Sequence, residues 1–290
     1  MSALTLQAPA KINLTLDILG RRPDGYHEMS MIMQSVSLWD DITLDLGSPG
    51  GIRAESDLWF LPGDNRNLAV AAALAFREAT GQTWQDLSVS IQKNIPTCAG
   101  TAGGSSDAAA VLRGLNTLTG AGLSLQALAH IGASVGSDVP YCVMGGTALA
   151  QGRGERLTPL PPLPPCFIIL CKPAFPISTP ALFQAWDRKK RRLRPDTEGA
   201  LKALEDGDLA ALGRRMFNVF EGALPPLQAQ EISRIKNTLI QAGALGASMS
   251  GSGPTVLGLF HREALAREAL RQLQEQYTEV FLTQPVPAHV

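Results

Sequence analysis

The chain has 290 residues, of which 45% are hydrophobic, and this content fits a folded protein with one large domain or two modest ones. Its formal net charge of −1 argues against attraction of the whole chain to nucleic acid or to an anionic membrane. The first residues carry no signal-peptide pattern, and the longest strongly apolar run, residues 68–76, is too short to span a bilayer. The cysteines are scattered without a C-x-x-C pair, at Cys98, Cys142, Cys166 and Cys171. We therefore expect reduced thiols, no zinc site, a cytoplasmic location, and neither a nucleic-acid nor a membrane partner.

Alternation of apolar and polar residues predicts a first strand, with Leu14, Leu16 and Ile18 on its core face. Lys11 and Asn13 then share the polar face, because side chains repeat every two residues along a strand. After a turn at residues 23–25, the patterns predict strands over 31–38, 41–46 and 87–93 and a helix over 67–80 that stops at Gly81.

Residues 96–110 form a run of small side chains, Pro-Thr-Cys-Ala-Gly-Thr-Ala-Gly-Gly-Ser-Ser-Asp-Ala-Ala-Ala, that leads from a strand directly into a helix. Ser105, Ser106 and Asp107 each suit the N-cap of this helix. A flexible loop at a helix N-terminus directs free N–H groups and the positive end of the helix dipole at one point, which favours phosphate. The alternative is an ordinary loop before a capped helix. The chain has no Gly-Lys dipeptide and no G-x-G-x-x-G, so neither a Walker loop nor a Rossmann fingerprint is present.

The second half of the chain continues with a mixture of helices and strands. A short helix is predicted over 125–131 and a strand over 139–149, and the pattern breaks near Gly152-Arg-Gly154. Five prolines between Pro159 and Pro165 form a stiff connector, so we expect a domain boundary that separates residues 1–155 from residues 156–290. Beyond it, the patterns predict a strand over 167–170, two helices within 197–220 split near Gly207, a helix over 231–242, a strand over 255–260 and a helix over 264–277. This order indicates an α+β fold.

Three further segments are candidates for chemistry. Pro140 disfavours helical backbone at the residue before it, so Asp138 is expected in a tight connection between a helix and a strand. It would be either a turn aspartate bonded to its own backbone or a carboxylate that accepts a proton from a substrate hydroxyl. Lys11 would be either a solvated strand residue or a fixed cation beside a phosphate. The small-residue loop at 246–254 would be either a flexible turn or a segment that closes over phosphate.

Two motifs carry competing functions that we consider weaker. Residues 132–136 match the G-x-S-x-G elbow of esterases, with Ser134 as nucleophile. That elbow follows a strand and opens a helix, whereas here a helix precedes it and an extended segment is expected to follow. The basic run from Arg188 to Arg194 could contact nucleic acid, but its shortness and the neutral charge of the chain favour a solvated loop.

Taken together, these segments resemble the GHMP kinases, a family named for galactokinase, homoserine, mevalonate and phosphomevalonate kinases. Pro9-Ala-Lys-Ile-Asn13, residues 96–109 and residues 248–254 match its three motifs in order. The resemblance covers nearly the whole chain. Further runs are most similar to the members that act on 4-diphosphocytidyl-2-C-methyl-D-erythritol in the non-mevalonate route to isoprenoid precursors: residues 9–14, 20–27, 136–140 and 218–221.

The resemblance implies a two-domain fold with the active site in the cleft between domains, where the γ-phosphoryl group of ATP passes to a hydroxyl of the methylerythritol part. It implies that Asp138 is the catalytic base and that Lys11 holds it ionised and stabilises charge on the reacting oxygen. It implies that Tyr26 stacks on cytosine, that His27 bonds the edge of the base and that Phe183 is a second stacking aromatic. The ATP site would consist of Asn67, Pro96, Ala99, Gly100, Thr101, Ala102, Gly103, Gly104, Ser105 and Ser106. The substrate site would add Asn13, Lys93, Gly251 and Ser252.

The expected cofactors are ATP and Mg²⁺; the metal ligands stay unassigned apart from a possible contribution by Ser106. The expected partner is the small-molecule substrate, a methylerythritol linked to cytidine diphosphate, and the chain is expected to be a monomer or a homodimer.

The chain departs from the family's usual Gly-Leu-Gly-Gly-Gly-Ser-Ser loop at Thr101 and Ala102. If position 102 needs left-handed backbone, alanine there costs about 1–2 kcal/mol. We therefore expect a shifted phosphate loop with weakened affinity for ATP. Two alternatives stay open: a mevalonate- or homoserine-type kinase, or a weakly active relative that binds nucleotide.

Overall fold

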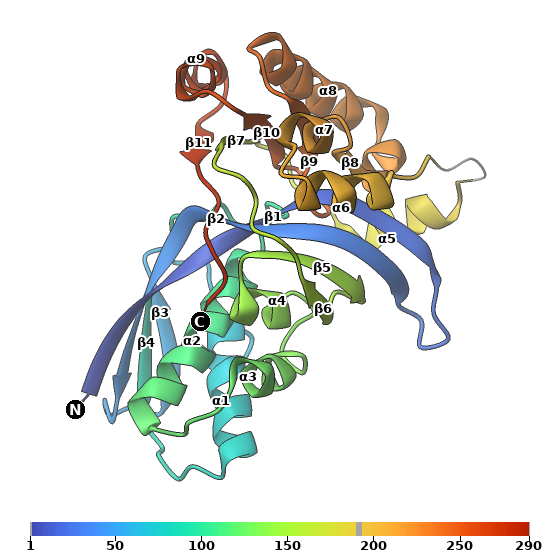
Figure 1. The fold of residues 1–290 in the computed structure, drawn as a ribbon. Helices are drawn as coiled ribbons and strands as arrows, with labels where there is room; N and C mark the ends of the chain where they lie inside the picture. Colours follow the sequence, from blue (N-terminus) through green and yellow to red (C-terminus); the bar gives the residue numbers. More distant parts are fainter. Residues whose placement is uncertain (1, 190–192, 290) are drawn as a thin grey trace.

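The computed structural model describes residues 2–189 and 193–289 (Figure 1). These residues form two β-sheets with helices packed on them, which confirms the predicted α+β class. None of the described helices has the length and apolar content that a bilayer span requires.

The N-terminal sheet is built on a hairpin of two long strands, β1 (Ser2–Arg21) and β2 (His27–Leu46). One half of β2 pairs with β4 (Leu87–Gln92) and the other half with β5 (Thr147–Gly152), so a single strand runs where two separate strands were predicted. The seven described strands of this sheet also include β3 (Ile52–Ser56), β6 (Arg156–Pro159) and β8 (Phe217–Asn218). β8 comes from the second half of the chain and pairs in parallel with β1 at Thr15 and Leu16.

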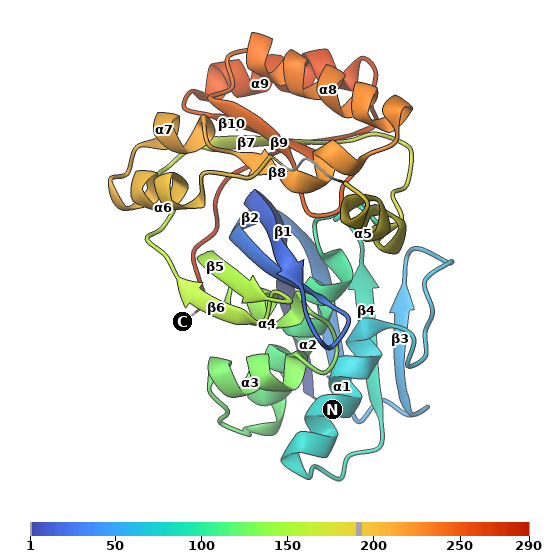
Figure 2. The ribbon, with the colours of Figure 1, turned by 90° about the vertical axis from the view of Figure 1, so that its right-hand side faces the viewer.

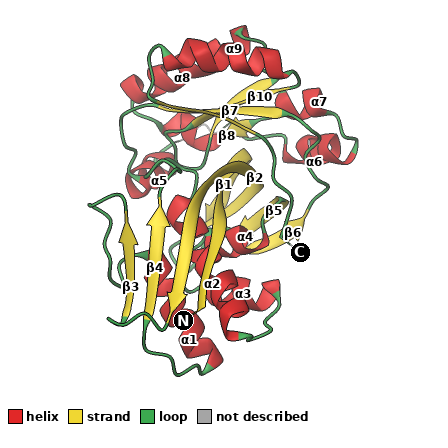
Figure 3. Cartoon of the chain, turned by 90° about the vertical axis from the view of Figure 1, so that its left-hand side faces the viewer, coloured by secondary structure: helices red, strands yellow, loops and turns green. Residues whose placement is uncertain are grey.

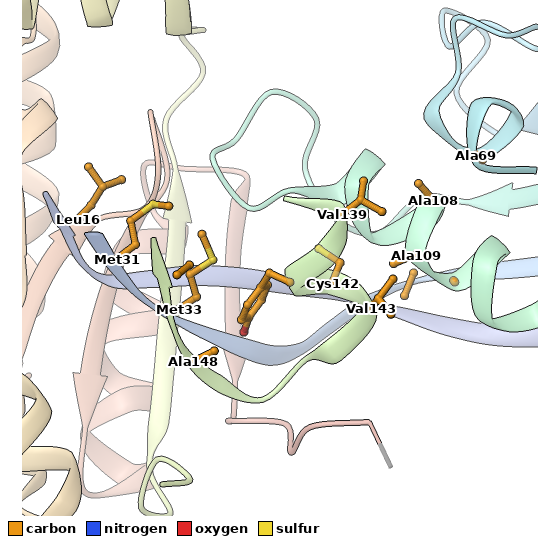
Figure 4. Packing of buried hydrophobic residues seen from close by; sticks show 14 of the residues in the cluster. Leu16, Met31, Met33, Ala69, Ala108, Ala109, Val139, Cys142, Val143 and Ala148 are labelled. Atoms are coloured by element: carbon orange, nitrogen blue, oxygen red, sulfur yellow. The ribbon is translucent and has the colours of Figure 1, made fainter. Parts of the chain in front are cut away.

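Helices cover one face of this sheet (Figures 2 and 3): α1 (Leu68–Thr80), α2 (Gly103–Thr119), α3 (Leu125–Gly132) and α4 (Val139–Met144). As predicted, α1 starts after Asn67, which caps it, and ends at Gly81 in left-handed backbone. The small buried side chains of α2, such as Ala108 and Ala109, pack in one cluster with Met31 and Met33 of β2 and with residues of α4 (Figure 4). This close packing places the N-terminal end of α2 beside the middle of the β1–β2 hairpin.

The second sheet is antiparallel in the order β11-β7-β10-β9, from β7 (Phe167–Lys172), β9 (Gly246–Met249), β10 (Val256–Phe260) and β11 (Glu279–Thr283). Its outer face carries α8 (Pro226–Gln241) and α9 (Glu263–Gln274) (Figure 2). Nearer the N-terminal sheet lie α5 (Thr179–Asp187) and α6 (Thr197–Glu205). A buried cluster that includes Ile12 of β1, Ile168 of β7 and Leu257 of β10 joins the two sheets.

The predicted polar face of the first strand is buried rather than solvated. Lys11, Asn13, Thr15 and Asp17 are each at most 4% exposed. Irregular pairing between residues 13 and 15 changes the alternation, so Leu14 joins a different core cluster from Leu16. The hairpin therefore carries buried polar side chains into the interior of the molecule.

The predicted strand over residues 139–149 is wrong in its first half, because the chain forms α4 there before β5. Pro140 lies in the first turn of α4, where a missing N–H breaks no helical hydrogen bond, so this proline is tolerated. The second helix predicted within 197–220 is also too long. In the structure this helix is the short α7 (Leu209–Gly213), which is followed by β8 and by a 3₁₀ helix, η1 (Val219–Ala223).

The chain passes from one sheet to the other between Pro159 and Phe167, along the proline-rich connector. The residues after β11 return to the first sheet, where Pro285 bridges to Val36 and Ala288 to Gly145. The division at residue 155 stays a prediction, since β6, β8 and the C-terminal residues all pair with the first part of the chain.

Candidate active site

A cavity of about 910 Å³ lies between the two sheets and receives side chains from both parts of the chain. Of the residues predicted for the site, Thr101 and Ser106 do not line it; both are buried beneath it. The remaining ones all line the cavity: Lys11, Asn13, Tyr26, His27, Asn67, Lys93, Pro96, Ala99, Gly100, Ala102, Gly103, Gly104, Ser105, Asp138, Phe183, Gly251 and Ser252. The fold therefore brings together residues that are up to 241 positions apart in the chain.

The glycine-rich segment reaches the cavity as a loop followed by the first turn of α2. The N-cap is Ala102, not one of the three predicted polar residues, because α2 begins at Gly103. Ala102 makes no side-chain capping hydrogen bond, and the first turn holds no acidic side chain. The first amides of the helix, at Gly103, Gly104 and Ser105, therefore have no helical carbonyl to bind and face a cavity suited to an anion.

Ala102 adopts left-handed backbone, with φ of 57°. This is the conformation in which a Cβ is penalised by about 1–2 kcal/mol, so the substitution relative to the family's usual glycine carries a backbone strain. Cys98 has positive φ as well, at 52°. The strain lies in the loop that leads into the first turn of α2, where the expected loss of ATP affinity would arise.

Lys11 and Asp138 meet on one wall of the cavity. Lys11 Nζ lies 3.7 Å from Asp138 Oδ2 and donates a 2.8 Å hydrogen bond to Asn13 Oδ1. The lysine side chain is buried, whereas the aspartate side chain is 32% exposed and can meet a ligand. Asp138 is the N-cap of α4 and not, as predicted, a connection to a strand. The side-chain nitrogen of Asn13, Nδ2, is buried and has no partner among the described residues, so a donor beside the pair is left for a ligand.

Lys93 lies beneath the glycine-rich loop in a buried triad with Asp40 and Asp107. Its Nζ pairs closely with Asp40 and lies 2.8 Å from Asp107 Oδ2. Burial alone would lower the pKa of Lys93, but the two carboxylates outweigh it and raise this pKa above its ordinary value. Asp40 also accepts hydrogen bonds from the amides of Asn94 and Ile95, which fixes the chain just before the loop. In this arrangement Lys93 is a structural cation at the base of the site.

The aromatic residues predicted for the substrate lie at another wall. The His27 ring stacks on Phe183 with a centroid distance of 4.4 Å and an interplanar angle of 19°, and His27 Nε2 lies 2.9 Å from Asp187 Oδ1. Tyr26 is 53% exposed, and the Arg153 guanidinium covers one side of its ring. His27 therefore covers one face of the Phe183 ring.

The loop after β9 closes against the glycine-rich loop. Ser250 Oγ donates to Gly100 O at 2.9 Å, and the backbone N–H of Asn13 donates to Ser250 Oγ at 3.3 Å. Buried Asn218 holds the same loop by donating to Met249 O and Gly251 O. In the sequence, the run 218–221 stands out only through the resemblance, because its role in supporting this loop depends on contacts that no local pattern reveals.

Comparison with known proteins adds to this geometry. The models described as GHMP kinases N terminal domain and GHMP kinases C terminal match residues 67–146 and 200–279. A protein from Geobacillus kaustophilus strain HTA426, named 4-diphosphocytidyl-2-C-methyl-D-erythritol kinase, is 45% identical over 279 residues, which are 96% of this chain and 95% of that protein. The chain belongs to the GHMP kinase family. A relative of the same name from Alkaliphilus metalliredigens strain QYMF is 40% identical over 98% of this chain and 97% of that protein.

Solved structures agree with this assignment. A crystal structure of 4-(cytidine 5'-diphospho)-2C-methyl-D-erythritol kinase matches with a TM-score of 0.81 and 32% identity, covering 97% of this chain and 99% of that one. Homoserine kinase from Cytophaga hutchinsonii matches with a TM-score of 0.77 and 20% identity over 99% and 96% of the two chains, which shows the shared fold alone. The GHMP fold thus accounts for both sheets and for the cavity between them.

The described residues of the two competing motifs do not line this cavity. Ser134 follows α3 and precedes α4, so the strand–turn–helix context of an esterase elbow is absent around this described residue, and its hydroxyl donates to Ile131 O at 2.8 Å. In the basic run, residues 190–192 lie outside the described residues. Arg194 pairs with Asp17 of β1 at 2.7 Å, which ties this segment to the N-terminal sheet.

Several cavity or supporting residues were missed by sequence reasoning. Arg153 lines the cavity, but in the sequence its segment is only a break in the pattern. Asp40 and Asp107 were missed because their partner, Lys93, is 53 and 14 positions away in the chain. An acidic residue within an apolar strand pattern, as at Asp40, is the kind of signal that could have indicated a buried ion pair.

Proposed function

We propose that this GHMP kinase transfers the γ-phosphoryl group of ATP to a hydroxyl on the methylerythritol part of 4-diphosphocytidyl-2-C-methyl-D-erythritol. The observation that carries the proposal is the Lys11–Asp138 pair, 3.7 Å apart, on the wall of a cavity that also receives the N-terminal turn of α2. A carboxyl group beside a buried lysine therefore stands near the helix turn that we propose to bind phosphate. The names of the relatives at 40–45% identity and of the 32% identical structure supply the identity of the substrate.

In the proposed reaction, the amides of Gly103, Gly104 and Ser105 hold the phosphates of ATP. The substrate hydroxyl gives its proton to an Asp138 carboxylate oxygen while its own oxygen forms a bond to the γ-phosphorus. The bond between that phosphorus and the bridging oxygen breaks, and ADP leaves. The Lys11 ammonium stabilises negative charge that develops on the reacting oxygens. Most of the rate enhancement would come from alignment and charge stabilisation, since the protein forms no covalent bond.

We propose that the cytosine base binds at Tyr26, His27 and Phe183. The base would take the place of the His27 ring on Phe183, and His27 would turn its ring nitrogen to the edge of the base. Stacking of a base on an aromatic side chain is worth about 1–3 kcal/mol, which is enough to select a substrate that carries cytosine.

We propose that Mg²⁺ enters with the nucleotide as MgATP. Among the described residues no group of three or more His, Cys, Asp or Glu side chains could hold a metal ion. The Ser106 hydroxyl is buried and donates to Pro9 O at 2.6 Å, so it does not fit a metal ligand here. We further propose that the enzyme works in the cytoplasm, as a monomer or homodimer, on small molecules.

A coupled ADP-release assay on the purified protein tests this function. We expect turnover with 4-diphosphocytidyl-2-C-methyl-D-erythritol and none with mevalonate or homoserine. Asp138→Asn should lower kcat by about 10²–10⁴-fold, because it removes the proton acceptor while preserving the shape of the side chain. Ser134→Ala is the matched control and should keep wild-type turnover. Undiminished activity of Asp138→Asn, or a preference for mevalonate or homoserine, would overturn the assignment.

A further inference from the structure

Arg153 differs from the other cations of the cavity in having no anionic partner close by. Lys11, Lys93 and Arg66 also line the cavity, and each lies within 4.0 Å of an aspartate. Within the described ranges, 2–189 and 193–289, no carboxylate oxygen lies within 4.0 Å of the Arg153 guanidinium, although neighbouring Arg156 pairs with Glu28. A half-buried guanidinium in this setting can bind an anion without first breaking an ion pair.

The contacts of Arg153 place it at the turn that carries Tyr26. The guanidinium carbon lies 4.9 Å from the centre of the Tyr26 ring, in a cation–π contact. In the same turn, the pKa of Asp24 is lowered. Burial would raise this pKa, but hydrogen bonds from the Tyr26 amide and from Arg22 outweigh that effect, and the positive charges of Arg22 and Arg153 lower the pKa further. The Arg153 charge is therefore felt at the wall where cytosine is proposed to bind.

The next residue, Gly154, lies close to the proposed catalytic base. A Cβ built on Gly154 would lie 3.4 Å from Ser137 O and 3.9 Å from Asp138 Oδ1. Residues 153 and 154 thus lead from the Tyr26 ring to the Asp138 carboxylate. In the substrate named above, a diphosphate joins the cytidine to the methylerythritol. With cytosine at Tyr26 and the methylerythritol at Asp138, this negatively charged diphosphate would lie between the two residues.

Resting on the proposed function, the geometry points to Arg153 as the residue that binds the diphosphate of the cytidylyl substrate. A guanidinium presents several N–H donors in one plane and forms charge-assisted, often bidentate hydrogen bonds with phosphate oxygens. Arg153 selects for substrates with this linkage, and the contact with Tyr26 holds its side chain at the cavity wall.

Kinetic constants of Arg153→Met, which removes the charge and preserves an unbranched side chain, provide the first measurement. We expect the KM for the cytidylyl substrate to rise about tenfold or more, with the KM for ATP within twofold of wild type. Arg153→Lys retains a charge without the planar group, and its KM for the cytidylyl substrate should lie between those of wild type and Arg153→Met. Arg156→Met is the matched control, because Arg156 is exposed and does not line the cavity, and it should leave all constants within twofold.

Binding of cytidine and of cytidine diphosphate to the same proteins gives a second measurement that needs no turnover. Arg153→Met should weaken the binding of cytidine diphosphate about tenfold and leave that of cytidine unchanged. Equal weakening of both ligands would show that Arg153 acts only through Tyr26, and unchanged binding of both would show no role; either result overturns the inference. If the wild type failed to phosphorylate the cytidylyl substrate, the proposed function would fall, and these binding constants would still decide the role of Arg153.

Discussion

At the scale of single residues, Asp107 is a buried carboxyl group at the base of the site. One of its carboxylate oxygens lies 2.8 Å from Lys93 Nζ, and the other is buried without a partner in the part of the chain that the structure describes. Burial raises its pKa to about 8; the Lys93 ammonium opposes this shift and Asp40 adds to it. In the unfolded chain an aspartate titrates near pH 4. Between about pH 4 and pH 8 the folded state therefore holds a proton that the unfolded state releases, so stability falls as pH rises through this window.

Asp107→Asn should remove this pH dependence, since asparagine offers Lys93 an oxygen and never ionises. We expect the free energy of unfolding of the wild type to decrease relative to that of the variant as pH rises from about 4 to 8, as measured by urea unfolding at several pH values. Asp40→Asn is the control and should be less stable than wild type throughout, because the Asp40 carboxylate binds two backbone amides and Lys93. Parallel curves for wild type and Asp107→Asn would contradict the assigned shift.

Residues in contiguous motifs could be predicted, and residues that act through distant contacts could not. Lys11, Asn13 and Asp138 were singled out from short runs, and the structure places all three on the cavity wall. The backbone around Asp138 was predicted wrongly, because the local effect of Pro140 on its neighbour is outweighed by helix formation in α4. Arg153 was overlooked because nothing in its local run indicates that the chain folds it onto Tyr26.

At the scale of structural elements, two loops from different parts of the chain pack backbone against backbone. Gly100 has φ of +76°, and a Cβ there would lie 2.2 Å from Ser250 O and 2.9 Å from Gly253 N. The glycine therefore serves two needs, left-handed backbone and close approach of the second loop. This contact fixes the loop after β9 over the N-terminal turn of α2.

Gly100→Ala and Gly120→Ala form a matched pair that separates these two needs. Gly120 also has positive φ, at +62°, but a Cβ there would meet nothing within 4 Å. We expect Gly120→Ala to lower the free energy of unfolding by about 1–2 kcal/mol through backbone strain alone. Gly100→Ala should lower the free energy of unfolding by about 1–3 kcal/mol more than this, through crowding. It should also reduce kcat, because the loop after β9 must move. Equal losses of stability in urea unfolding, with kcat unchanged in both, would show that the loop contact is unimportant.

Among elements, local signals predicted the existence and type of α1, β4, α2 and β10. Alternation marks β4, and the alanine-rich run of α2 favours helix. The start of α2 was misplaced by several residues, because its N-cap lacks the polar side chain that normally marks one. The joining of two predicted strands into β2 depends on pairing with both β4 and β5, which are distant in the chain.

At the scale of the whole molecule, the C-terminal residues tie the second sheet back to the first (Figure 1). The Val286 amide donates to Ser35 O at 2.8 Å, and the His289 amide donates to Met144 O at 2.9 Å. Met144 is the last residue of α4, whose N-cap is Asp138. The tail therefore anchors the short helix that positions the proposed base.

Ending the chain after Pro285 should both destabilise the protein and lower kcat. It removes the Val286 and His289 hydrogen bonds and the one that Gln34 donates to Val286 O, so we expect a loss of about 2–4 kcal/mol in urea unfolding. The full-length variant Val286→Ala retains these main-chain bonds and should stay close to wild type. A truncated protein with wild-type stability and kcat would rule out the anchoring role.

The central claim is that the loop and helix turn at residues 99–105 hold ATP so that its γ-phosphorus faces a substrate hydroxyl beside Asp138. A crystal structure of the protein with a non-hydrolysable ATP analogue and 4-diphosphocytidyl-2-C-methyl-D-erythritol measures this directly. The account predicts phosphate oxygens on the amides of Gly103 to Ser105 and the acceptor hydroxyl within about 3.2 Å of an Asp138 oxygen. Nucleotide bound elsewhere, or a hydroxyl turned away from Asp138 with the loop empty, would contradict it.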